Sequence, residues 1–182
     1  MTSKKILQTV FLFAALTITT NAQIEFTGLG SSLGIGGINS NSPSFTVLGG
    51  SIFFDVAPWF SDQLILRPGF TYARKIEYFL PENRHGRVYP FMKSFSLKAV
   101  IQQTLQRNIF IEETAGVLYL NDRTFQTNEW MPGILFSILG GLDFTDYKSK
   151  GLQLGLGLEY GLTFTKTNAN YYLVSLQSKI IL

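Results

Sequence analysis

The sequence of 182 residues contains no cysteine and a single histidine, His85. The lack of cysteine excludes a disulfide framework, thiol catalysis, a cysteine-ligated metal and a lipid anchor on an N-terminal cysteine. With one histidine, a two-histidine metal site cannot form, and a Ser-His-acid triad would have to assemble around His85. We therefore expect no catalytic residues, no metal and no cofactor, and we predict that the protein is not an enzyme.

Long hydrophobic runs are scarce as well. The chain is 46% hydrophobic with 16 Phe and 8 Tyr, yet beyond residue 22 no stretch reaches the roughly 18 consecutive apolar residues of a membrane helix, which excludes a helical membrane protein. The chain also has little net charge. Residues 1–22 carry two lysines and no acid, so the formal net charge of +3 falls to +1 without them. Nucleic acid is therefore not expected as a partner.

Residues 1–22 have the pattern of a secretory signal peptide. Lys4 and Lys5 precede an apolar stretch over residues 6–18, and the small residues Thr20 and Ala22 stand at positions −3 and −1 of a cleavage site. The stretch is shorter than the roughly 20 residues that cross a bilayer as a helix, which makes an uncleaved anchor the weaker alternative. We predict cleavage after Ala22 and a single β-barrel domain over residues 23–182.

Apolar and polar residues alternate through residues 151–166. Every even position from Leu152 to Phe164 is apolar, whereas the odd positions hold glycine, glutamine, glutamate and threonine. Successive side chains of a strand point to opposite faces, so this segment is predicted to be a two-faced strand. Its length of about 14 residues exceeds a usual soluble strand and reaches past the roughly 9–11 that span a membrane. Residues 172–182 repeat the pattern up to Leu182, as in the C-terminal strand of outer-membrane barrels.

Eight such segments follow one another along the chain. They cover residues 24–37, 44–57, 64–74, 93–103, 109–120, 133–144, 151–166 and 172–182. The connections alternate between short turns (58–63, 104–108 and 145–150) and longer or more irregular loops (38–43, 75–92, 121–132 and 167–170). Outer-membrane barrels have an even number of strands, short periplasmic turns and longer external loops. We therefore predict an all-β, eight-stranded antiparallel up-and-down transmembrane β-barrel in the outer membrane, with both termini periplasmic.

Two positions break the alternation. Glu113 shares a face with the apolar residues of its segment, and we expect a β-bulge near Glu112 and Glu113 that turns both carboxylates away from lipid. Phe26 is out of phase with Leu29 and Leu33. The first predicted strand is therefore the least regular of the eight.

Aromatic residues gather where the predicted strands meet their connections, as in the two aromatic girdles of a membrane barrel. Because a backbone in hydrocarbon must satisfy every N–H and C=O group, eight amphipathic strands imply a closed barrel, with hydrocarbon outside and polar side chains packed within. With this pattern the chain resembles the small eight-stranded outer-membrane β-barrel family, of the OmpA/OmpX and PorT-like kind. The resemblance implies a fold and a location more than an activity.

Four charged residues are predicted to form an ion-pair network in the lumen: Arg67, Lys98, Glu112 and Glu159. Three of them fall about four or five residues from a short turn in successive strands, so we expect them at similar height in an interior that side chains fill. The network either compensates buried charge structurally or forms a charged constriction that gates a channel. Inward glycines of the first and seventh strands are expected to leave space for the long cationic side chains.

The loop over residues 75–92 and its flanks are rich in basic residues, with aromatic residues between them. The predicted contacts to lipopolysaccharide are Arg74, Lys75, Arg84, His85, Arg87 and Lys93. On the outer surface these side chains would pair with lipid phosphates through charge-assisted hydrogen bonds. The alternative is a solvated loop with a fringe of interfacial cations.

These features together predict a structural or surface-interaction role. The barrel would be plugged by side chains, and its external loops would contact envelope lipid or an unidentified protein partner. The alternative is a narrow channel or an accessory subunit of an outer-membrane transport or secretion complex. A third interpretation, a secreted soluble barrel of the lipocalin kind, places the apolar face inward around a ligand.

Overall fold

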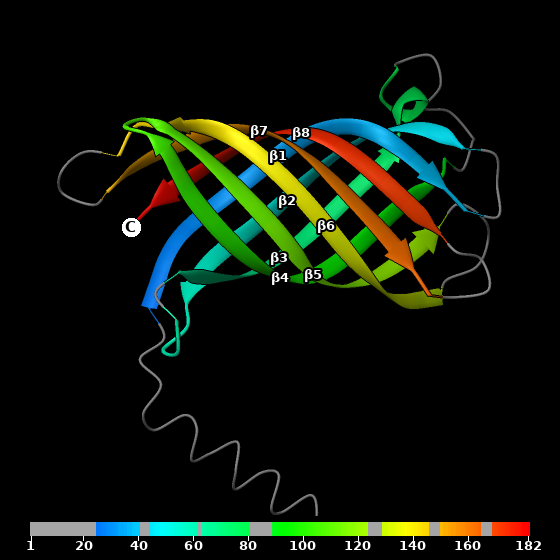
Figure 1. Cartoon of the computed structure of the whole chain (residues 1–182). Helices are drawn as coiled ribbons and strands as arrows, with labels where there is room; N and C mark the ends of the chain where they lie inside the picture. Colours follow the sequence, from blue (N-terminus) through cyan, green and yellow to red (C-terminus); the bar gives the residue numbers. More distant parts are fainter. Residues whose placement is uncertain are drawn as a thin grey trace, which may run out of the picture.

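Eight antiparallel strands form a closed barrel in the computed structural model, which describes residues 25–40, 44–61, 63–80, 89–123, 129–145, 150–164 and 169–182 (Figure 1). The strands are β1 (Glu25–Asn39), β2 (Phe45–Ala57), β3 (Leu64–Lys75), β4 (Phe91–Gln106), β5 (Ile109–Arg123), β6 (Glu129–Asp143), β7 (Gly151–Thr163) and β8 (Asn170–Ile181). Each strand pairs with its neighbour in the chain, and β1 closes the barrel against β8. The predicted up-and-down barrel of eight strands is confirmed.

The two ends of the barrel differ in their connections. At one end, β4 turns into β5 through Arg107 and Asn108 alone, and the backbone N–H of Leu182 donates to the carbonyl of Thr27 at 3.1 Å. We call this the short-turn end; β1 begins and β8 finishes there (Figure 1). The opposite end, the loop end, carries a short 3-10 helix, η1 (Ile76–Phe79), between β3 and β4. In the part of the chain that the structure describes, no helix is long and apolar enough to cross a bilayer.

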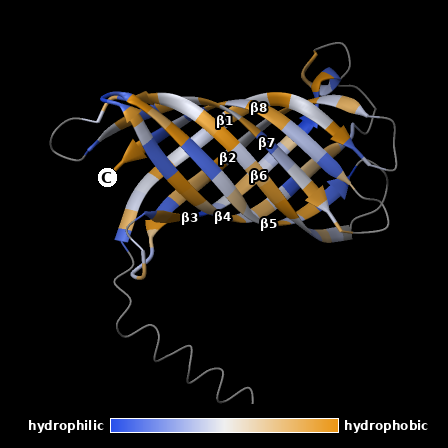
Figure 2. Ribbon diagram, viewed as in Figure 1, coloured by the Kyte–Doolittle hydropathy of each residue, from blue (hydrophilic) through white to orange (hydrophobic). Residues whose placement is uncertain are grey.

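The outer surface of the barrel is apolar. Leu33 is 71% exposed, and Ile52, Leu156 and Leu176, each on a different strand, are 62–63% exposed. Figure 2 shows hydrophobic residues recurring along the strands between paler or blue ones, because every second side chain of a strand points outward. The leucine-bearing face of β7 therefore points outward as predicted. The lipocalin-like interpretation, which needs that face inside, is wrong.

A β-bulge in β1 explains the irregular phase of Phe26. The register between β1 and β2 shifts between Phe26↔Val56 and Gly28↔Asp55, so β1 has one extra residue opposite this part of β2. As a result Phe26 and Leu29 both point outward, with 48% and 52% of their surface exposed. The least regular segment of the sequence is thus a complete strand of the barrel.

The β-bulge that we expected at Glu112 and Glu113 is absent, and this prediction is wrong. The ladders that join β5 to β4 and to β6 run through both residues without a shift. Glu112 is buried, at 1% exposure, whereas Glu113 lies exposed on the outer face beside Ile101 and Ile138. A bulge here would interrupt two continuous ladders and withdraw Glu112 from its cationic partners in the lumen. The strand therefore keeps its phase, and one carboxylate stays among apolar neighbours.

Replacing Glu113 with leucine is expected to stabilise the barrel. A charge on the lipid-facing side of a barrel costs free energy that depends on its depth. We expect Glu113→Leu to raise the free energy of unfolding by about 1 kcal/mol, less than the ~2–4 kcal/mol found for Arg or Lys at the bilayer midplane. Urea titration of the protein in phospholipid vesicles measures this change. A lower stability of the variant would contradict a lipid-facing position.

The lumen is filled in two layers. Towards the short-turn end its buried side chains are charged or polar, and Asp55, Arg67, Glu112, Gln153 and Lys179 are at most 3% exposed. Towards the loop end a cluster of apolar side chains fills the barrel: Ile38, Val47, Ala73, Met92, Leu118, Leu120, Met131, Leu135, Ala169, Tyr171 and Leu173. The expectation of polar side chains throughout the interior therefore holds for one half only. The other half is a mostly apolar plug, with the buried polar residues Thr71, Ser94, Asp122 and Thr163 among the apolar ones.

Candidate functional site

Arg67 is the centre of a group of charged side chains in the polar half of the lumen. Its guanidinium donates to Asp55 of β2 from Nε at 2.6 Å and from Nη2 at 2.8 Å. It also donates to Glu112 of β5 from Nη1 at 2.8 Å and from Nη2 at 3.1 Å. The planar guanidinium suits such paired contacts with carboxylates. The Phe53 ring packs against it, with the guanidinium carbon 4.4 Å from the ring centroid.

Lys179 of β8 completes this group. Its Nζ lies 2.7 Å from Oε1 of Glu112 and 3.4 Å from Oδ2 of Asp55, and it donates to Oε1 of Gln102 at 3.0 Å. The side chains of Arg67, Lys179, Asp55 and Glu112 are at most 4% exposed. We call these four residues the Arg67 cluster. Its two cations and two carboxylates carry no net charge, which limits the cost of burying them.

Lys98 and Glu159 form a second charged pair beside the Arg67 cluster. Lys98 of β4 donates to Glu159 of β7 across the lumen, and the Tyr171 hydroxyl donates to the other carboxylate oxygen at 2.8 Å. Lys98 and Arg67 are directly opposite in the register of β3 and β4, where like charges are unfavourable unless each has its own partner. The structure thus brings together all four lumen residues taken from the sequence, in two neutral sets.

A small polar void touches both charged sets. It measures about 30 Å³, and its lining includes serines from four strands, Ser32, Ser51, Ser137 and Ser175. The hydroxyls of Ser32 and Ser51 lie 2.7 Å apart. A polar cavity of this size has room for one or two water molecules. The lumen at this level is therefore packed, with space for bound water only.

Sequence reasoning missed Asp55 and Lys179 as members of the site. Both stand at inward positions of alternating segments, so the phase of β2 and of β8 was a usable signal for burial. The contact between these two residues could not be predicted in the same way. Asp55 and Lys179 meet only because β8 closes the barrel beside β1, next to β2, and no pattern within one strand encodes that contact.

The inward glycines of β1 and β7 make room for large neighbouring side chains. A Cβ added at Gly30 would lie 2.3 Å from the ring of Phe53, and one added at Gly161 would lie 2.2 Å from the ring of Tyr171. These rings in turn pack against the charged sets. Leu139 fills the space beside Gly155 and Gly157. Lys98 extends across the lumen to Glu159 of β7, so long cations and aromatic rings both occupy the side of the lumen where these glycines lie.

The basic residues predicted to contact lipopolysaccharide are only partly within the described chain. Arg84, His85 and Arg87 lie outside the described residues. Lys75 forms a partly exposed salt bridge with Glu77 of η1, with Nζ and Oε2 2.9 Å apart. Lys75 is therefore already paired with an acidic residue close to it in the chain. Arg74 and Lys93, on the outer face, are better candidates for binding an anion.

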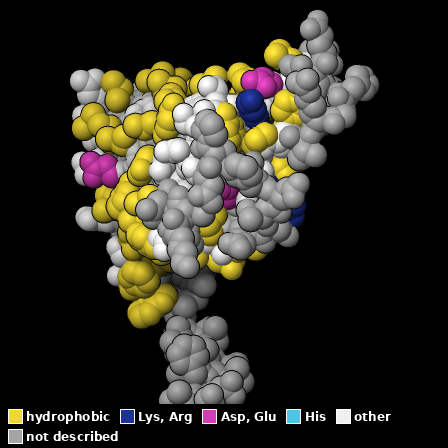
Figure 3. Space-filling model, turned by 90° about the vertical axis from the view of Figure 1, so that its right-hand side faces the viewer, with side chains coloured by type: hydrophobic (Ala, Val, Ile, Leu, Met, Phe, Trp, Pro, Cys, Tyr) yellow, Lys and Arg dark blue, Asp and Glu magenta, His cyan; other side chains and the backbone are white. Residues whose placement is uncertain are grey.

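Arg74 and Lys93 lie at the loop end on the outer face of the barrel, against aromatic rings. The guanidinium carbon of Arg74 is 3.3 Å from the ring centroid of Tyr78, and Nζ of Lys93 is 5.3 Å from that of Trp130. Arg123, at the end of β5, joins them and was missed by sequence reasoning. Figure 3 looks at the loop end and shows basic side chains beside apolar ones at the edge of the barrel.

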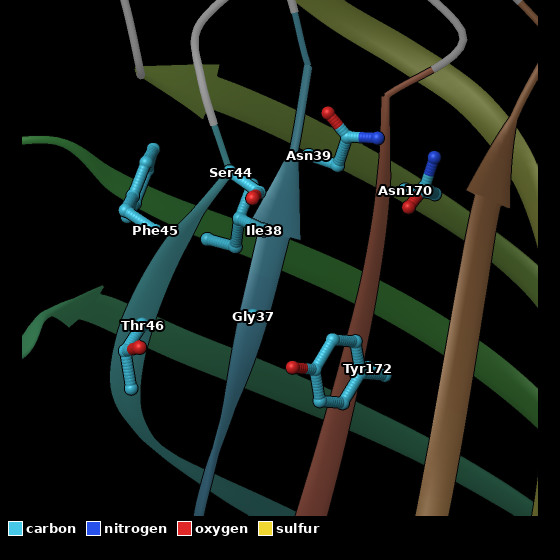
Figure 4. Close-up of a pocket in the computed structure, with 8 residues that line it drawn as sticks. All are labelled: Gly37, Ile38, Asn39, Ser44, Phe45, Thr46, Asn170 and Tyr172. Atoms are coloured by element: carbon cyan, nitrogen blue, oxygen red, sulfur yellow. The ribbon is translucent and has the colours of Figure 1, made fainter.

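A shallow hollow of about 160 Å³ lies elsewhere on the loop end, between β1, β2 and β8 (Figure 4). Its lining consists of Gly37, Ile38, Asn39, Ser44, Phe45, Thr46, Asn170 and Tyr172. The Tyr172 ring covers Gly37, where an added Cβ would lie 2.7 Å from the ring. The lining offers amides and hydroxyls without a charged side chain, so it suits water or a small neutral polar group.

The charged sets of the lumen offer little to a chemical reaction. Asp55, Glu112 and Glu159 are each bound by at least one cation, and the void beside them is too small for a substrate. Within the described ranges, no three His, Cys, Asp or Glu side chains are placed to hold a metal ion. The arrangement is suited to holding strands together. That the protein is not an enzyme stays a prediction.

A closed eight-stranded up-and-down barrel with an apolar exterior and a filled, charge-paired interior has the fold of the small outer-membrane β-barrels. The sequence matches no protein-family model and no curated protein. Among solved structures, Neisserial surface protein A (NspA) superimposes with a TM-score of 0.61 at 10% identity, over 87% of this chain and 99% of that chain. This similarity shows the fold, consistent with the OmpA/OmpX-like family; the PorT-like resemblance stays a prediction.

Two further solved barrels are similar over most of their length. Ail, the attachment invasion locus protein of Yersinia pestis, solved with the heparin analogue sucrose octasulfate, has a TM-score of 0.48 at 12% identity and covers 87% of this chain and 100% of that one. The outer membrane enzyme PagL has a TM-score of 0.44 at 18% identity and covers 84% of this chain and 97% of that one.

Proposed function

We propose that this protein is an outer-membrane β-barrel with a structural or surface-interaction role. The observation that carries the proposal is the apolar outer face of a closed barrel, with Leu33, Ile52, Leu156 and Leu176 all more than 60% exposed. Water would penalise so much exposed apolar surface, whereas hydrocarbon does not. A barrel closed by backbone pairing also leaves no unpaired strand edge in lipid.

The proposed orientation puts the short-turn end in the periplasm and the loop end outside the cell. Short turns on the periplasmic side are the rule for such barrels, and β1 begins at that end. Residues 1–22 would act as the signal peptide that brings the chain to the envelope. The loop end, with its basic and aromatic side chains, would then contact lipopolysaccharide or a protein partner.

Membrane fractionation combined with gel mobility tests the location. The protein should be found with the outer membrane, and unboiled samples should migrate differently from boiled ones, because a closed barrel resists detergent until it is heated. Recovery in the soluble periplasmic fraction, with the same mobility before and after boiling, would reject the proposal.

A planar-bilayer recording separates the plugged barrel from the alternative, a narrow channel. We expect no discrete openings from the wild-type protein, because the lumen combines a packed charged layer with the apolar plug at the loop end. Discrete openings that disappear in Arg67→Ala or Glu112→Ala would instead favour the channel, or an accessory role in a transport or secretion complex.

A further inference from the structure

The outer face of β3, β4, β5 and β6 changes in character step by step from the loop end towards the short-turn end. Because paired residues on adjacent strands stand side by side, the register defines rows across this face. The rows are, in order, Arg74, Phe91 and Arg123; then Tyr72, Lys93, Asn121 and Trp130; then Phe70, Phe95, Tyr119 and Pro132; then Pro68, Leu97, Val117 and Ile134. Cations and aromatic rings thus share the two upper rows, aromatic rings dominate the third row, and the fourth row is aliphatic.

The two arginines of the top row share one aromatic ring, and a lysine lies in the row below. The guanidinium carbons of Arg74 and Arg123 lie 5.8 and 5.9 Å from the centroid of the same ring, that of Phe91. Their strands β3 and β5 flank β4, so the two backbones are about 10 Å apart. Lys93 projects from β4 between them, one row lower. We call Arg74, Lys93 and Arg123 the outer cation triad.

The outer cation triad has donors to spare. None of its three members forms an ion pair with an acidic side chain that the structure describes, in contrast to the nearby Lys75. The Nε atoms of Arg74 and Arg123 are buried and have no hydrogen-bond partner. The hydroxyl of Tyr72, 3.5 Å from Nη1 of Arg74, is a weak substitute for an anion. Both arginines are only partly buried, so an anion can approach them and form charge-assisted hydrogen bonds.

A stacked aromatic ledge supports the triad from below. The ring of Trp130 stacks on Tyr119 with centroids 5.1 Å apart and on Phe95 with centroids 5.7 Å apart. The ring of Phe95 also contacts that of Phe70 in a tilted arrangement, with centroids 5.1 Å apart. Such rings prefer the interface between water and hydrocarbon. A ligand that fills the triad therefore meets apolar surface directly beneath it, which favours an amphiphilic ligand.

We propose that the outer cation triad binds the phosphate headgroup of an outer-leaflet glycolipid of the lipopolysaccharide type. The phosphate lies between Arg74, Lys93 and Arg123, and the acyl chains follow the aromatic and aliphatic rows below. This proposal rests on the proposed function, since the loop end has to face the outer leaflet. It places the site on three strands of the barrel wall, with Arg123 as a member, and does not depend on the loop basic residues Arg84 and Arg87.

The test measures binding of lipid A to the full-length barrel in detergent, by ligand-induced thermal stabilisation. Lipid A carrying both phosphates should stabilise the wild-type barrel, and lipid A stripped of its phosphates should do so far less. Arg74→Gln combined with Arg123→Gln should weaken binding of phosphorylated lipid A by about tenfold or more, because charge-assisted hydrogen bonds are lost. Inorganic phosphate alone should give no comparable stabilisation, because it cannot use the aromatic ledge.

Two control variants locate the site. Arg107→Gln changes an arginine in the turn at the short-turn end and should bind phosphorylated lipid A within about twofold of wild type, because it lies at the opposite end of the barrel. Arg84→Gln with Arg87→Gln changes the loop and should cost less affinity than the Arg74 and Arg123 variant. Unchanged affinity in the Arg74 and Arg123 variant, a larger loss in the loop variant, or equal stabilisation by inorganic phosphate would overturn the proposal.

Heat-dependent gel mobility accompanies each binding measurement. A variant that keeps the wild-type mobility shift is folded, so a change in its affinity reports on the site. If the wild-type protein itself shows no mobility shift and no outer-membrane location, the proposed function fails. If those hold and the affinity is insensitive to the triad, only the lipid site fails.

Discussion

Replacing Glu112 with glutamine is expected to lower the free energy of unfolding by about 3–5 kcal/mol, the usual result of removing one partner from a buried charge network. The shape of the side chain is kept, so the change isolates its charge. Without the charge of Glu112, Arg67 and Lys179 share the single carboxylate of Asp55. The cluster then carries a net positive charge in a buried interior with room for only one or two water molecules. Urea titration in phospholipid vesicles, followed by the fluorescence of Trp59 and Trp130, measures the loss.

The adjacent carboxylate provides the matched control for this experiment. Glu113 differs from Glu112 only in the face of β5 from which it projects, so Glu113→Gln should be neutral or mildly stabilising. A second control removes the excess charge: Glu112→Gln combined with Lys179→Gln leaves Arg67 and Asp55 as a neutral pair. We expect the double variant to be more stable than the sum of the single changes predicts. Strict additivity would contradict a coupled cluster.

Gly36→Ala is expected to destabilise the barrel by about 3 kcal/mol, the upper end of what overpacking costs. Gly36 lies in β1 at the seam with β8, and an added Cβ would lie 1.8 Å from the carbonyl oxygen of Tyr172 and 2.9 Å from Cα of Leu173. Both are backbone atoms, so no side-chain rotation relieves the contact. The two strands have to separate, and this seam is where the barrel closes. The same urea titration measures the effect.

Gly140→Ala is the matched control for the seam. Gly140 is also a strand glycine, in β6, but an added Cβ there would have no atom closer than the carbonyl oxygen of Phe110 at 4.0 Å. Its replacement should be neutral or stabilise by about 0.4–1 kcal/mol, because alanine restricts the unfolded chain. Equal losses at Gly36 and Gly140 would show a general intolerance of alanine in these strands and would contradict the close approach at the seam.

Much of the fold follows from alternation along single strands. Residues 151–166 predict β7 (Gly151–Thr163), and the outward positions of Leu152 to Leu162 are as expected. The prediction failed where pairing between neighbouring strands decides the local structure. Alternation placed Glu113 towards lipid, we expected a bulge to correct it, and the continuous ladders of β5 prevented one. The pairing of a strand with both of its neighbours determines where a bulge is tolerated. The sequence of a single strand does not show this pairing.

The candidate site was less accessible to sequence reasoning than the fold. Inward positions could be read from alternation, so Arg67, Lys98, Glu112 and Glu159 could be placed in the lumen. Their pairing could not, because Lys98 crosses to Glu159 while Arg67 binds Asp55 and Glu112. Arg123 was also missed, since it joins Arg74 and Lys93 only through the register of three strands.

The sequence by itself determined the number of strands, their two faces and the apolar exterior, because these depend on a period of two that each strand carries within itself. Only the tertiary structure decided the contacts across the lumen and across strands: the two neutral charge sets, the apolar plug at the loop end and the outer cation triad. Closure of β1 on β8 and the register between strands bring distant residues together, and neither is encoded in the pattern of any one strand.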